Sequence, residues 1–302
     1  MKAITIRSEL DAKCTIDTTA CTEREHMSTI DGVIRLKHVI ESDFERIHQQ
    51  LWNASLLLAD FILDIKPQLN GAVILEIAAG TGFLSVLLAR NEYQILPKHI
   101  FCTDLPGTLA LIQENVDLNK VQDQVSVRVL DFCDNSPLSV KEGAIIPSRF
   151  CWNAQDLDLL QECSLIFAAD VLYEDSITFS FVKCLPKLLY PNRSLYLALE
   201  RRLQFTFDAR VTAPAVDYFF DTLNAFNEQY EYEGRSTVEY EKVDLRIGSL
   251  HFLQELDTER MEIWLLKLSW IVSTYSVAIV KRDRFDRRSW QAHHQVAFDH
   301  KF

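Results

Sequence analysis

A turn that contains two glycines, Glu76 to Gly82 (EIAAGTG), is the strongest local pattern for chemistry in the chain. It stands between an apolar run typical of a buried strand and an apolar run typical of a helix. Glycines at such a turn let a ligand approach the backbone, and the start of the helix offers free N–H groups. Asp104 follows Gly82 by 22 residues, close to the roughly 20 expected for a carboxylate that binds ribose hydroxyls. A lone Gly-x-Gly is also a common tight turn, but the combination predicts a nucleoside-binding site.

Glu76, at the start of this turn, helps to distinguish which nucleoside-containing cofactor the site would bind. The turn nearly matches the dinucleotide fingerprint, but Ser85 stands where close helix packing favours a third glycine. Glu76 would repel a diphosphate and attract the cationic amino-acid end of S-adenosylmethionine. The pattern therefore favours a methyl donor over NAD. The alternative for Glu76 is an interaction with the dipole of the following helix.

Further polar residues follow other predicted strands. Asp131 ends the run VRVLD, where it either contacts an adenine amine or forms an ordinary turn. Asp170 and Tyr173 follow the run LIFAA, at the carboxyl end of a strand, where ligands bind in open α/β sheets. The alternative for Asp170 is that it caps the next helix. Glu200 to Arg202 follow a fifth strand and either shape a substrate entrance or are surface charges beside a buried aromatic residue.

The elements that must position these residues alternate between strand and helix. Continuous apolar runs predict buried strands, and apolar residues at three- and four-residue spacing predict helices. The predicted strands are 72–77, 99–104, 125–130, 165–169, 194–199, 237–243 and 261–268, and the predicted helices are 51–64, 83–90, 106–119, 174–190 and 211–230. This alternation predicts an α/β fold with a doubly wound, mostly parallel sheet. The last two strands lack a crossover helix, which predicts an antiparallel pair.

The segment 131–163 is too long for a simple connection between two strands, which predicts a disordered segment or a lid.

The composition limits the class of protein. The chain has 302 residues, 48% of them hydrophobic and 25% charged, which excludes a wholly disordered or collagen-like chain. Its formal net charge of −12 would repel a phosphate backbone, so direct nucleic-acid binding is not expected. The odd count of 7 cysteines, without a C-x-x-C pair, predicts reduced thiols in the cytosol or nucleus and no metal site. The longest uncharged apolar run, residues 268–280, has 13 residues, so no membrane span is expected, because a spanning helix needs about 20.

Several of these runs together resemble a known enzyme family. ILEIAAGTGFLSVLLA, IFCTD and AADVLYED are similar to the lysine-directed class I methyltransferases called family 16, and Asp170 to Tyr173 match their Asp-x-x-Tyr motif. The resemblance reaches from about His38 to Leu268 and includes the more specific runs IFAADVLYED and LERRLQFTF. It implies a seven-stranded, Rossmann-like methyltransferase sheet with an antiparallel last strand. It also implies S-adenosyl-L-methionine as cofactor and methyl transfer to a lysine side chain of a protein.

The resemblance further implies a role for each candidate residue. Asp170 and Tyr173 are the implied catalytic residues and face the lysine. The implied cofactor-binding residues are Trp52 over the pocket, Glu76, Ala78, Gly80 and Gly82 at the methionine end, Asp104 at the ribose, Asp131 and Phe132 at the adenine, and Ala169 beside the cofactor. Ala78 replaces the first glycine of the family's turn, so its methyl group is expected to crowd the donor.

The expected organisation is one catalytic domain with two flanking segments. Residues 1–45 are predicted to be a partly disordered lead with one short strand between Gly32 and Ile40, residues 46–268 the methyltransferase domain, and residues 269–302 an unassigned tail. Lys281 to Arg288 carries a net charge of +3, five basic minus two acidic residues, so the rest of the chain carries −15. Such an acidic body suits a basic, nuclear protein substrate, and the protein is expected to be a monomer in the nucleus or cytoplasm.

Two other functions stay open beside a protein-lysine methyltransferase. A non-catalytic binding module that has kept the fold is consistent with Ala78 in the glycine turn. An NAD-dependent oxidoreductase would share the nucleoside-binding half, although the sequence has no evident catalytic constellation of His or Lys to accompany it. The methyltransferase is therefore the leading hypothesis.

Overall fold

The computed structural model describes residues 5–8, 14–17, 34–38, 50–140, 147–205, 211–245, 252 and 260–269. The chain divides into two compact units, Met1–Ser269 and Trp270–Phe302, and the second unit lies outside the described residues, as does the basic segment Lys281 to Arg288. Within the described part of the chain, no helix is long and apolar enough to cross a membrane.

A seven-stranded sheet forms the centre of the described part of the first unit. Its strands are β4 (Val73–Ile77), β5 (His99–Asp104), β6 (Val125–Val129), β7 (Cys163–Ala169), β8 (Ser194–Glu200), β11 (Thr237–Lys242) and β12 (Met261–Ser269), in the spatial order β11-β12-β8-β7-β4-β5-β6. β12 pairs antiparallel with both of its neighbours, and the other pairs are parallel. This confirms the predicted doubly wound, mostly parallel sheet with an antiparallel last strand.

The order of the strands reverses at β4, and this places the crevice in which ligands bind. β5, the next strand along the chain, lies on one side of β4, and β7 lies on the other. The two crossover connections therefore leave in opposite directions, which opens a crevice at the carboxyl ends of these strands. All five residues of β4 are buried, as expected for a central strand covered on both faces.

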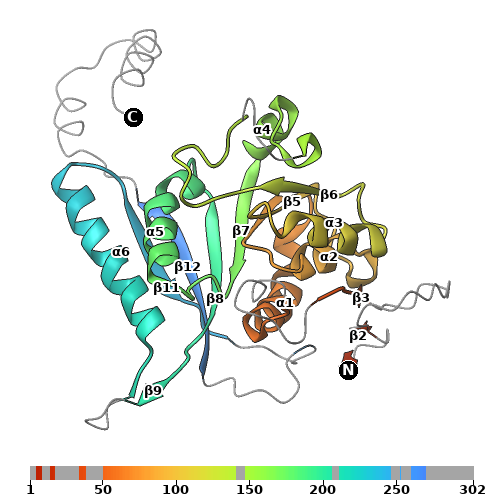
Figure 1. Ribbon diagram of the computed structural model, residues 1–302, viewed down its shortest axis with the longest axis horizontal. Coiled ribbons are helices and arrows are strands. Elements are labelled where there is room, and N and C mark those ends of the chain that lie inside the picture. Colours follow the sequence, from red (N-terminus) through yellow and green to blue (C-terminus); the bar gives the residue numbers. More distant parts are fainter. Residues whose placement is uncertain are drawn as a thin grey trace, which may run out of the picture. The chain divides into compact units, whose positions relative to one another are not determined.

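Helices cover both faces of the sheet (Figure 1). On one face lie α1 (Asn53–Ile65), α2 (Phe83–Ala89) and α3 (Leu109–Leu118), and on the other lie α5 (Asp175–Leu189) and α6 (Pro214–Tyr232). α3 begins three residues later than predicted, so Pro106 precedes it, and α6 begins at Pro214, a residue suited to the first helical position. Val211–Thr212 form instead the short strand β10, which pairs with β9 (Gln204–Phe205).

The connection from β6 to β7 corrects one prediction. Its described part contains a short helical turn, η4 (Ser148–Phe150), and α4 (Ala154–Leu160), so the prediction of a disordered segment is wrong for these residues, and the alternative of a lid stays a prediction. Trp152 is buried and its Nε1 atom donates to the carbonyl oxygen of Val129 at 2.7 Å. The sequence pattern did not predict α4, because this helix is short and its capping box uses Asn153 and Asp156 rather than the usual Ser or Thr with Glu.

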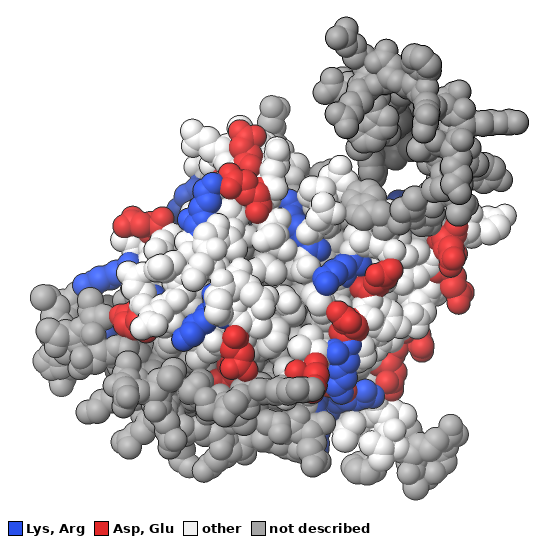
Figure 2. Space-filling view, turned by 180° about the vertical axis from the view of Figure 1, so that it is seen from behind, with Lys and Arg blue, Asp and Glu red and all other residues white. Residues whose placement is uncertain are grey.

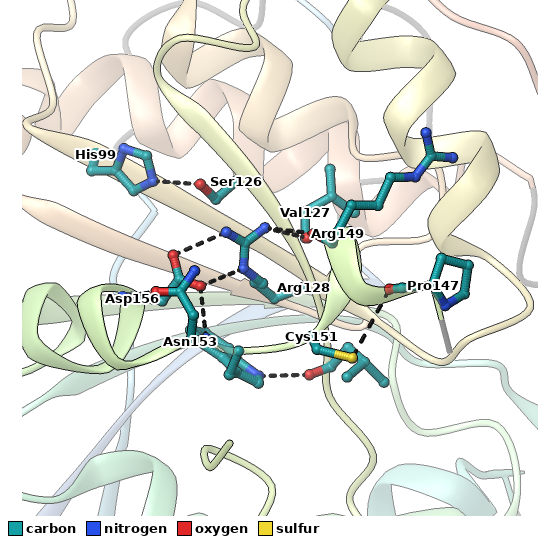
Figure 3. Close-up of polar contacts among 11 residues, drawn as sticks. His99, Ser126, Val127, Arg128, Pro147, Arg149, Cys151, Asn153 and Asp156 are labelled. Atoms are coloured by element: carbon teal, nitrogen blue, oxygen red, sulfur yellow. Dashed lines mark hydrogen bonds and ion pairs between the residues drawn. The ribbon is translucent and has the colours of Figure 1, made fainter. Parts of the chain in front are cut away.

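A buried ion pair holds this connection against the sheet (Figure 3). The guanidinium of Arg128 on β6 donates to both carboxylate oxygens of Asp156, at 2.7 and 2.9 Å, and also to the carbonyl oxygens of Val127 and Arg149. Asp156 in turn accepts from the backbone N–H of Asn153. The guanidinium and the carboxylate are therefore largely satisfied by protein groups, as a buried pair requires.

The chain before α1 also contributes described elements. β1 (Thr5–Ser8) pairs antiparallel with β2 (Cys14–Asp17), which pairs in parallel with β3 (Ile34–Arg35), inside the range predicted for a short strand. Two side-chain amides, that of Asn115 on α3 and that of Asn119 directly after it, bond the backbone of Lys37 and Arg35 in both directions. Short 3-10 turns, η2 (Lys66–Leu69) and η3 (Asn91–Tyr93), complete the connections near β4 and β5.

Candidate functional site

The glycine turn after β4 adopts a backbone that favours glycine. Gly80 and Gly82 have φ angles of +58° and +73°, and Gly82 is the residue before the first turn of α2. A Cβ atom added at Gly82 would lie 2.9 Å from the Cγ2 atom of Ile112, so a side chain is excluded there by space as well as by φ. Ala78 also has a positive φ, +50°, although it carries a methyl group. The family's glycine is thus replaced at a position where the backbone is strained for alanine.

Asp104 lies against this turn. Its Oδ2 atom accepts from the backbone N–H of Gly80 at 2.7 Å, and its Oδ1 atom accepts from Leu105 at 2.6 Å. The contact follows from the parallel pairing of β4 with β5, in which Glu76 is opposite Cys102, so that both strands end at the same edge. The predicted meeting of turn and carboxylate is confirmed in position, and the contact with a ribose stays a prediction.

Glu76 is buried beneath the turn. Its Oε2 atom accepts from the backbone N–H of Ser85 at 2.8 Å and from the Ser85 hydroxyl. Burial raises the pKa of this carboxyl group from 4.5 to about 7, against the lowering effect of the bonds from Ser85. Because Ser85 is in the first turn of α2, this is the interaction with the helix terminus that the sequence left as an alternative. The predicted contact with the amino group of a donor stays a prediction.

A small pocket opens at the carboxyl ends of β4 to β7. Five of the predicted site residues line it together with five residues that the sequence did not single out: Ala78, Asp104, Asp131, Phe132 and Tyr173, with Leu105, Leu130, Cys133, Val171 and Ile177. Its volume is about 40 Å³, below the roughly 300 Å³ of common ligand pockets, so a nucleoside would have to displace some of the lining side chains. The Tyr173 side chain, with 48% of its surface exposed, lies at the boundary with solvent.

Asp131 fits both of its interpretations. Its side chain lines the pocket, and its Oδ1 atom also accepts from the backbone N–H of Cys133 at 2.8 Å, which makes a local turn. A larger groove of about 560 Å³ lies along β11 and the end of α6, but its described lining contains none of the predicted site residues. The smaller pocket is the better candidate because it lies at the switch point of the sheet and has two carboxylates in its wall.

Asp170 lies beyond the end of β7 with a φ angle of +56°, and its backbone N–H donates to Ala198 on β8. Its side chain is 5% exposed and forms an ion pair with Arg202. Burial raises the pKa of Asp170 from 3.8 to about 6, and Arg202 opposes this change. The alternative that Asp170 caps the next helix is wrong, because the residue at that cap is Glu174.

Tyr173 is three residues further on and its phenol is partly buried. Burial raises the pKa of Tyr173, and the negative charge of Asp104 adds to this increase. The phenol therefore keeps its proton at neutral pH. Tyr173 faces the small pocket, whereas Asp170 contacts Arg202, so one short segment connects the pocket to a buried carboxylate that is paired with a partly exposed arginine.

The remaining predicted residues lie near the pocket but are not among its described lining. Trp52 precedes the first turn of α1, and the Cζ atom of Arg202 is 4.9 Å from the centre of its ring. Ala169 is the last residue of β7 and lies opposite Ala198. The predicted contacts of Trp52 and Ala169 with a cofactor stay predictions. In the described ranges, no group of three His, Cys, Asp or Glu residues is arranged to hold a metal ion.

Sequence reasoning did not pair Arg202 with Asp170, although a signal was present. Both residues follow neighbouring parallel strands, β7 and β8, at the same edge of the sheet. Opposite charges at the ends of adjacent parallel strands are candidates for an ion pair. The residues after β8 were expected either to shape a substrate entrance or to be surface charges, and Arg202 contacts the predicted lysine site.

Comparison with known proteins supports the resemblance. The family model described as lysine methyltransferase matches residues 35–163. Human methyltransferase-like protein 22 is 29% identical over 243 residues, which are 77% of this chain and 57% of that protein, and the mouse protein is 28% identical over 80% of this chain and 61% of its own length. The EEF1A lysine methyltransferase 3 of Xenopus tropicalis is 25% identical over half of this chain and 57% of its own length.

The chain thus spans about three fifths of the length of methyltransferase-like protein 22, which the runs quoted above also resemble. Among solved structures, the mitomycin 7-O-methyltransferase MmcR aligns over 74% of this chain and 56% of its own, with 13% identity and a TM-score of 0.43. The predicted resemblance is therefore confirmed as a similarity: the chain is similar to the lysine methyltransferase family model over residues 35–163 and to methyltransferase-like protein 22 over 77% of its own length.

Proposed function

We propose that the protein is an S-adenosylmethionine-dependent methyltransferase that methylates a lysine side chain of a protein. One observation carries this proposal beyond the family resemblance: the segment from Asp170 to Tyr173 connects a buried carboxylate that binds a cation to the pocket at the switch point. Lysine methylation needs a site for an ammonium ion next to a site for the methyl donor. A buried carboxylate beside a nucleoside pocket meets that need.

The residues around the pocket fit such a donor. Asp104 would accept from ribose hydroxyls, and the apolar side chains of Leu130, Phe132 and Ile177 would enclose an adenine. The glycine turn would hold the methionine end, where a Cβ at Gly82 has no room. When bound, S-adenosylmethionine supplies a methyl group activated by a positively charged sulfur.

The chain's own residues would prepare the lysine. A free lysine has a pKa of about 10.4, so its ammonium must lose a proton before it can attack. Asp170 would hold the ammonium as it enters, and desolvation beside a positive charge would lower the pKa of the amine. Once its proton has passed to solvent, the neutral amine would be the nucleophile, and S-adenosylmethionine would supply the methyl group together with the sulfur that keeps the electrons of the broken C–S bond. Most of the rate would come from alignment, because the methyl group is already activated.

The proposed substrate is a basic protein of the nucleus or cytoplasm, bound by a monomer, and not a nucleic acid. The formal net charge of −12 supports a basic partner, because opposite charges accelerate encounter. Figure 2 shows one face of the molecule, on which the described Lys and Arg side chains lie among Asp and Glu side chains rather than in a continuous basic stripe. A nucleic-acid site would favour such a stripe.

Two measurements test the proposal. Calorimetry with S-adenosylmethionine and with NAD should show binding of the first alone, and binding of NAD alone would favour the oxidoreductase. Labelled S-adenosylmethionine should then transfer methyl groups to lysines in a nuclear extract with the wild-type protein and not with Asp170→Ala. Donor binding without any transfer would favour the non-catalytic module. Asp175→Asn, a change at an exposed acid in the first turn of α5, is the matched control and should leave transfer intact.

A further inference from the structure

We propose that Asp170 and Trp52 form the binding site for the ammonium group of the substrate lysine, and that Arg202 occupies this site until the lysine displaces it. Arg202 contacts both residues: its guanidinium pairs with the Asp170 carboxylate, and its Cζ atom lies 4.9 Å from the centre of the Trp52 ring. That the incoming cation is a substrate lysine rests on the proposed function. The existence of the cation site rests on these contacts.

The two partners of Arg202 have the chemistry of a built cation site. A buried carboxylate provides a charge-assisted hydrogen bond, and the face of an indole ring attracts a cation through its quadrupole. Asp170 is nearly inaccessible, with 5% of its side chain exposed, so a cation bound to it is partly removed from water. Such a site would accept either a guanidinium or an ammonium group, and it gives Trp52 a role toward the substrate rather than over the cofactor.

Among Arg202, Asp170 and Trp52, Arg202 is the residue whose side chain is free to leave the site. Asp170 is held at the end of β7 by its backbone bond to Ala198, and Trp52 is held at the start of α1, where its carbonyl oxygen accepts from Ser55. Arg202 lies in the irregular stretch 201–203 between β8 and β9, and 41% of its side chain is exposed. Its long side chain can therefore rotate into solvent without moving a strand or a helix.

The charges around Asp170 favour replacement of Arg202 by another cation over departure of Arg202 alone. If Arg202 left and nothing replaced it, a buried carboxylate would lose its counter-ion, which is strongly unfavourable. The negative charge of Glu200, close enough to affect the pKa of Asp170, would make this worse. Departure of Arg202 is therefore coupled to arrival of another cation or of a proton at the carboxylate. The ammonium of a lysine on a flexible stem is a small cation that would reach the same two partners.

The neighbouring Arg201 provides a matched control. Its guanidinium lies 3.5 Å from Asp217 and 3.6 Å from Glu262, and 34% of its side chain is exposed. It has the same charge as Arg202 and directly precedes it in the chain, but it pairs with Asp217 and Glu262 rather than with Asp170. A change that acts through general surface charge would affect both variants equally, whereas our proposal assigns the effect to Arg202.

The test uses n-butylammonium, which has the charge and four-carbon chain of a lysine side chain, with n-butanol as the uncharged probe. The protein is labelled with fluorotryptophan at its 5 tryptophans, and fluorine NMR follows the Trp52 signal, assigned with Trp52→Phe. Titrations are made at about pH 8 and again at about pH 9, because Arg202 lowers the pKa of Asp170, so its removal in Arg202→Ala raises that pKa above the value of about 6, whereas the alkylammonium stays charged. Thermal unfolding confirms that each variant is folded.

Arg202→Ala should bind n-butylammonium at least about tenfold more tightly than the wild type, because the internal competitor is gone. Arg202→Lys and Arg201→Ala should match the wild type, and Arg202→Ala combined with Asp170→Asn should lose the gain. Equal affinity of Arg202→Ala and the wild type, or an equal response to n-butanol, would overturn the proposal.

The result of the n-butylammonium test can be distinguished from the result of the test of the proposed function. If the protein binds no S-adenosylmethionine but Arg202→Ala gains affinity for n-butylammonium, the methyltransferase proposal fails and the cation site stands. If methyl transfer is observed but Arg202→Ala gains no affinity, the methyltransferase proposal stands and Arg202 does not occupy the lysine site.

Discussion

The backbone N–H of Gly80 donates to the Oδ2 atom of Asp104 at 2.7 Å, and this bond joins the turn after β4 to the end of β5. The other oxygen of Asp104 accepts from Leu105, so the carboxylate is fixed in orientation within a mostly apolar pocket wall. A ligand that bonds this carboxylate would meet a group that is already ordered. Preorganisation of this kind improves affinity because less freedom is lost on binding.

Gly82→Ala should be much more destabilising than Gly71→Ala. Both glycines have a φ of +73°, but an added Cβ at Gly82 would lie 2.9 Å from Ile112, whereas at Gly71 nothing lies within 4 Å. The left-handed backbone alone should lower the free energy of unfolding by about 1 kcal/mol at Gly71, and backbone plus overlap by about 3 kcal/mol at Gly82. Urea denaturation measures both, and equal losses would show that the overlap is relieved without cost.

Ala78→Gly should improve binding of S-adenosylmethionine by about threefold or more. The change removes a methyl group from the pocket wall and relieves a left-handed alanine, which costs about 1 kcal/mol. Ala79→Gly is the control, because Ala79 is not among the residues with positive φ and is absent from the described lining of the pocket. Calorimetry that finds no gain for Ala78→Gly, or the same gain for both, would contradict the crowding of the donor by Ala78.

Tyr173→Ala should weaken binding of S-adenosylhomocysteine by about tenfold, whereas Tyr173→Phe should leave it unchanged. The ring contributes apolar surface to the pocket wall, and burial of such surface stabilises a bound nucleoside by about 1 to 2 kcal/mol. Phe179→Ala removes a ring of similar exposure, 53%, from α5 outside the described pocket lining and should have no effect. An equal loss of affinity for the Tyr173→Ala and Phe179→Ala variants would show that the loss does not depend on the pocket wall.

Glu76 predicts how stability depends on pH. Its pKa rises from 4.5 to about 7 in the folded protein, so between these values the folded state retains a proton that the unfolded state has lost. The stabilisation that protonated Glu76 gives the folded state is therefore complete below about pH 4.5, and it decreases as the pH rises toward 7. Glu76→Gln removes the titration, so its free energy of unfolding should gain about 3 kcal/mol relative to the wild type across that range. Urea denaturation at several pH values measures this, and a constant difference would contradict a raised pKa.

The pair of Arg128 and Asp156 should contribute strongly to stability. Their side chains are 14% and 10% exposed, and Asp156 also closes the capping box of α4. Loss of either partner would leave a nearly buried charge without its counter-ion, so Asp156→Ala should lower the free energy of unfolding by about 3 kcal/mol. The control pair, Lys98 and Glu162, is about half exposed, and Glu162→Ala should cost below about 1 kcal/mol. Similar losses for both acids would show that burial does not set the difference.

The sequence by itself determined the class of the sheet, doubly wound and mostly parallel, and the edge at which the candidate site residues lie. Residues 73–77 could be recognised as a central strand because they are apolar throughout, as a strand covered on both faces requires. The carboxyl ends of parallel strands meet at one edge, so Asp104 and Asp170 could be assigned to the same side of the molecule without coordinates. The glycines after β4 were recognisable because glycine readily adopts a left-handed turn.

Only the tertiary structure decided which partners these side chains have. Glu76 bonds Ser85 at the start of α2, Asp170 pairs with Arg202, and Asp156 pairs with Arg128. The first contact was one of two alternatives for Glu76, and the two ion pairs were not predicted. The physical reason is that a charged side chain is bound by whatever group the packing of neighbouring elements brings within hydrogen-bond distance. Strand register and burial set that distance and the local dielectric, and both are properties of the folded chain as a whole.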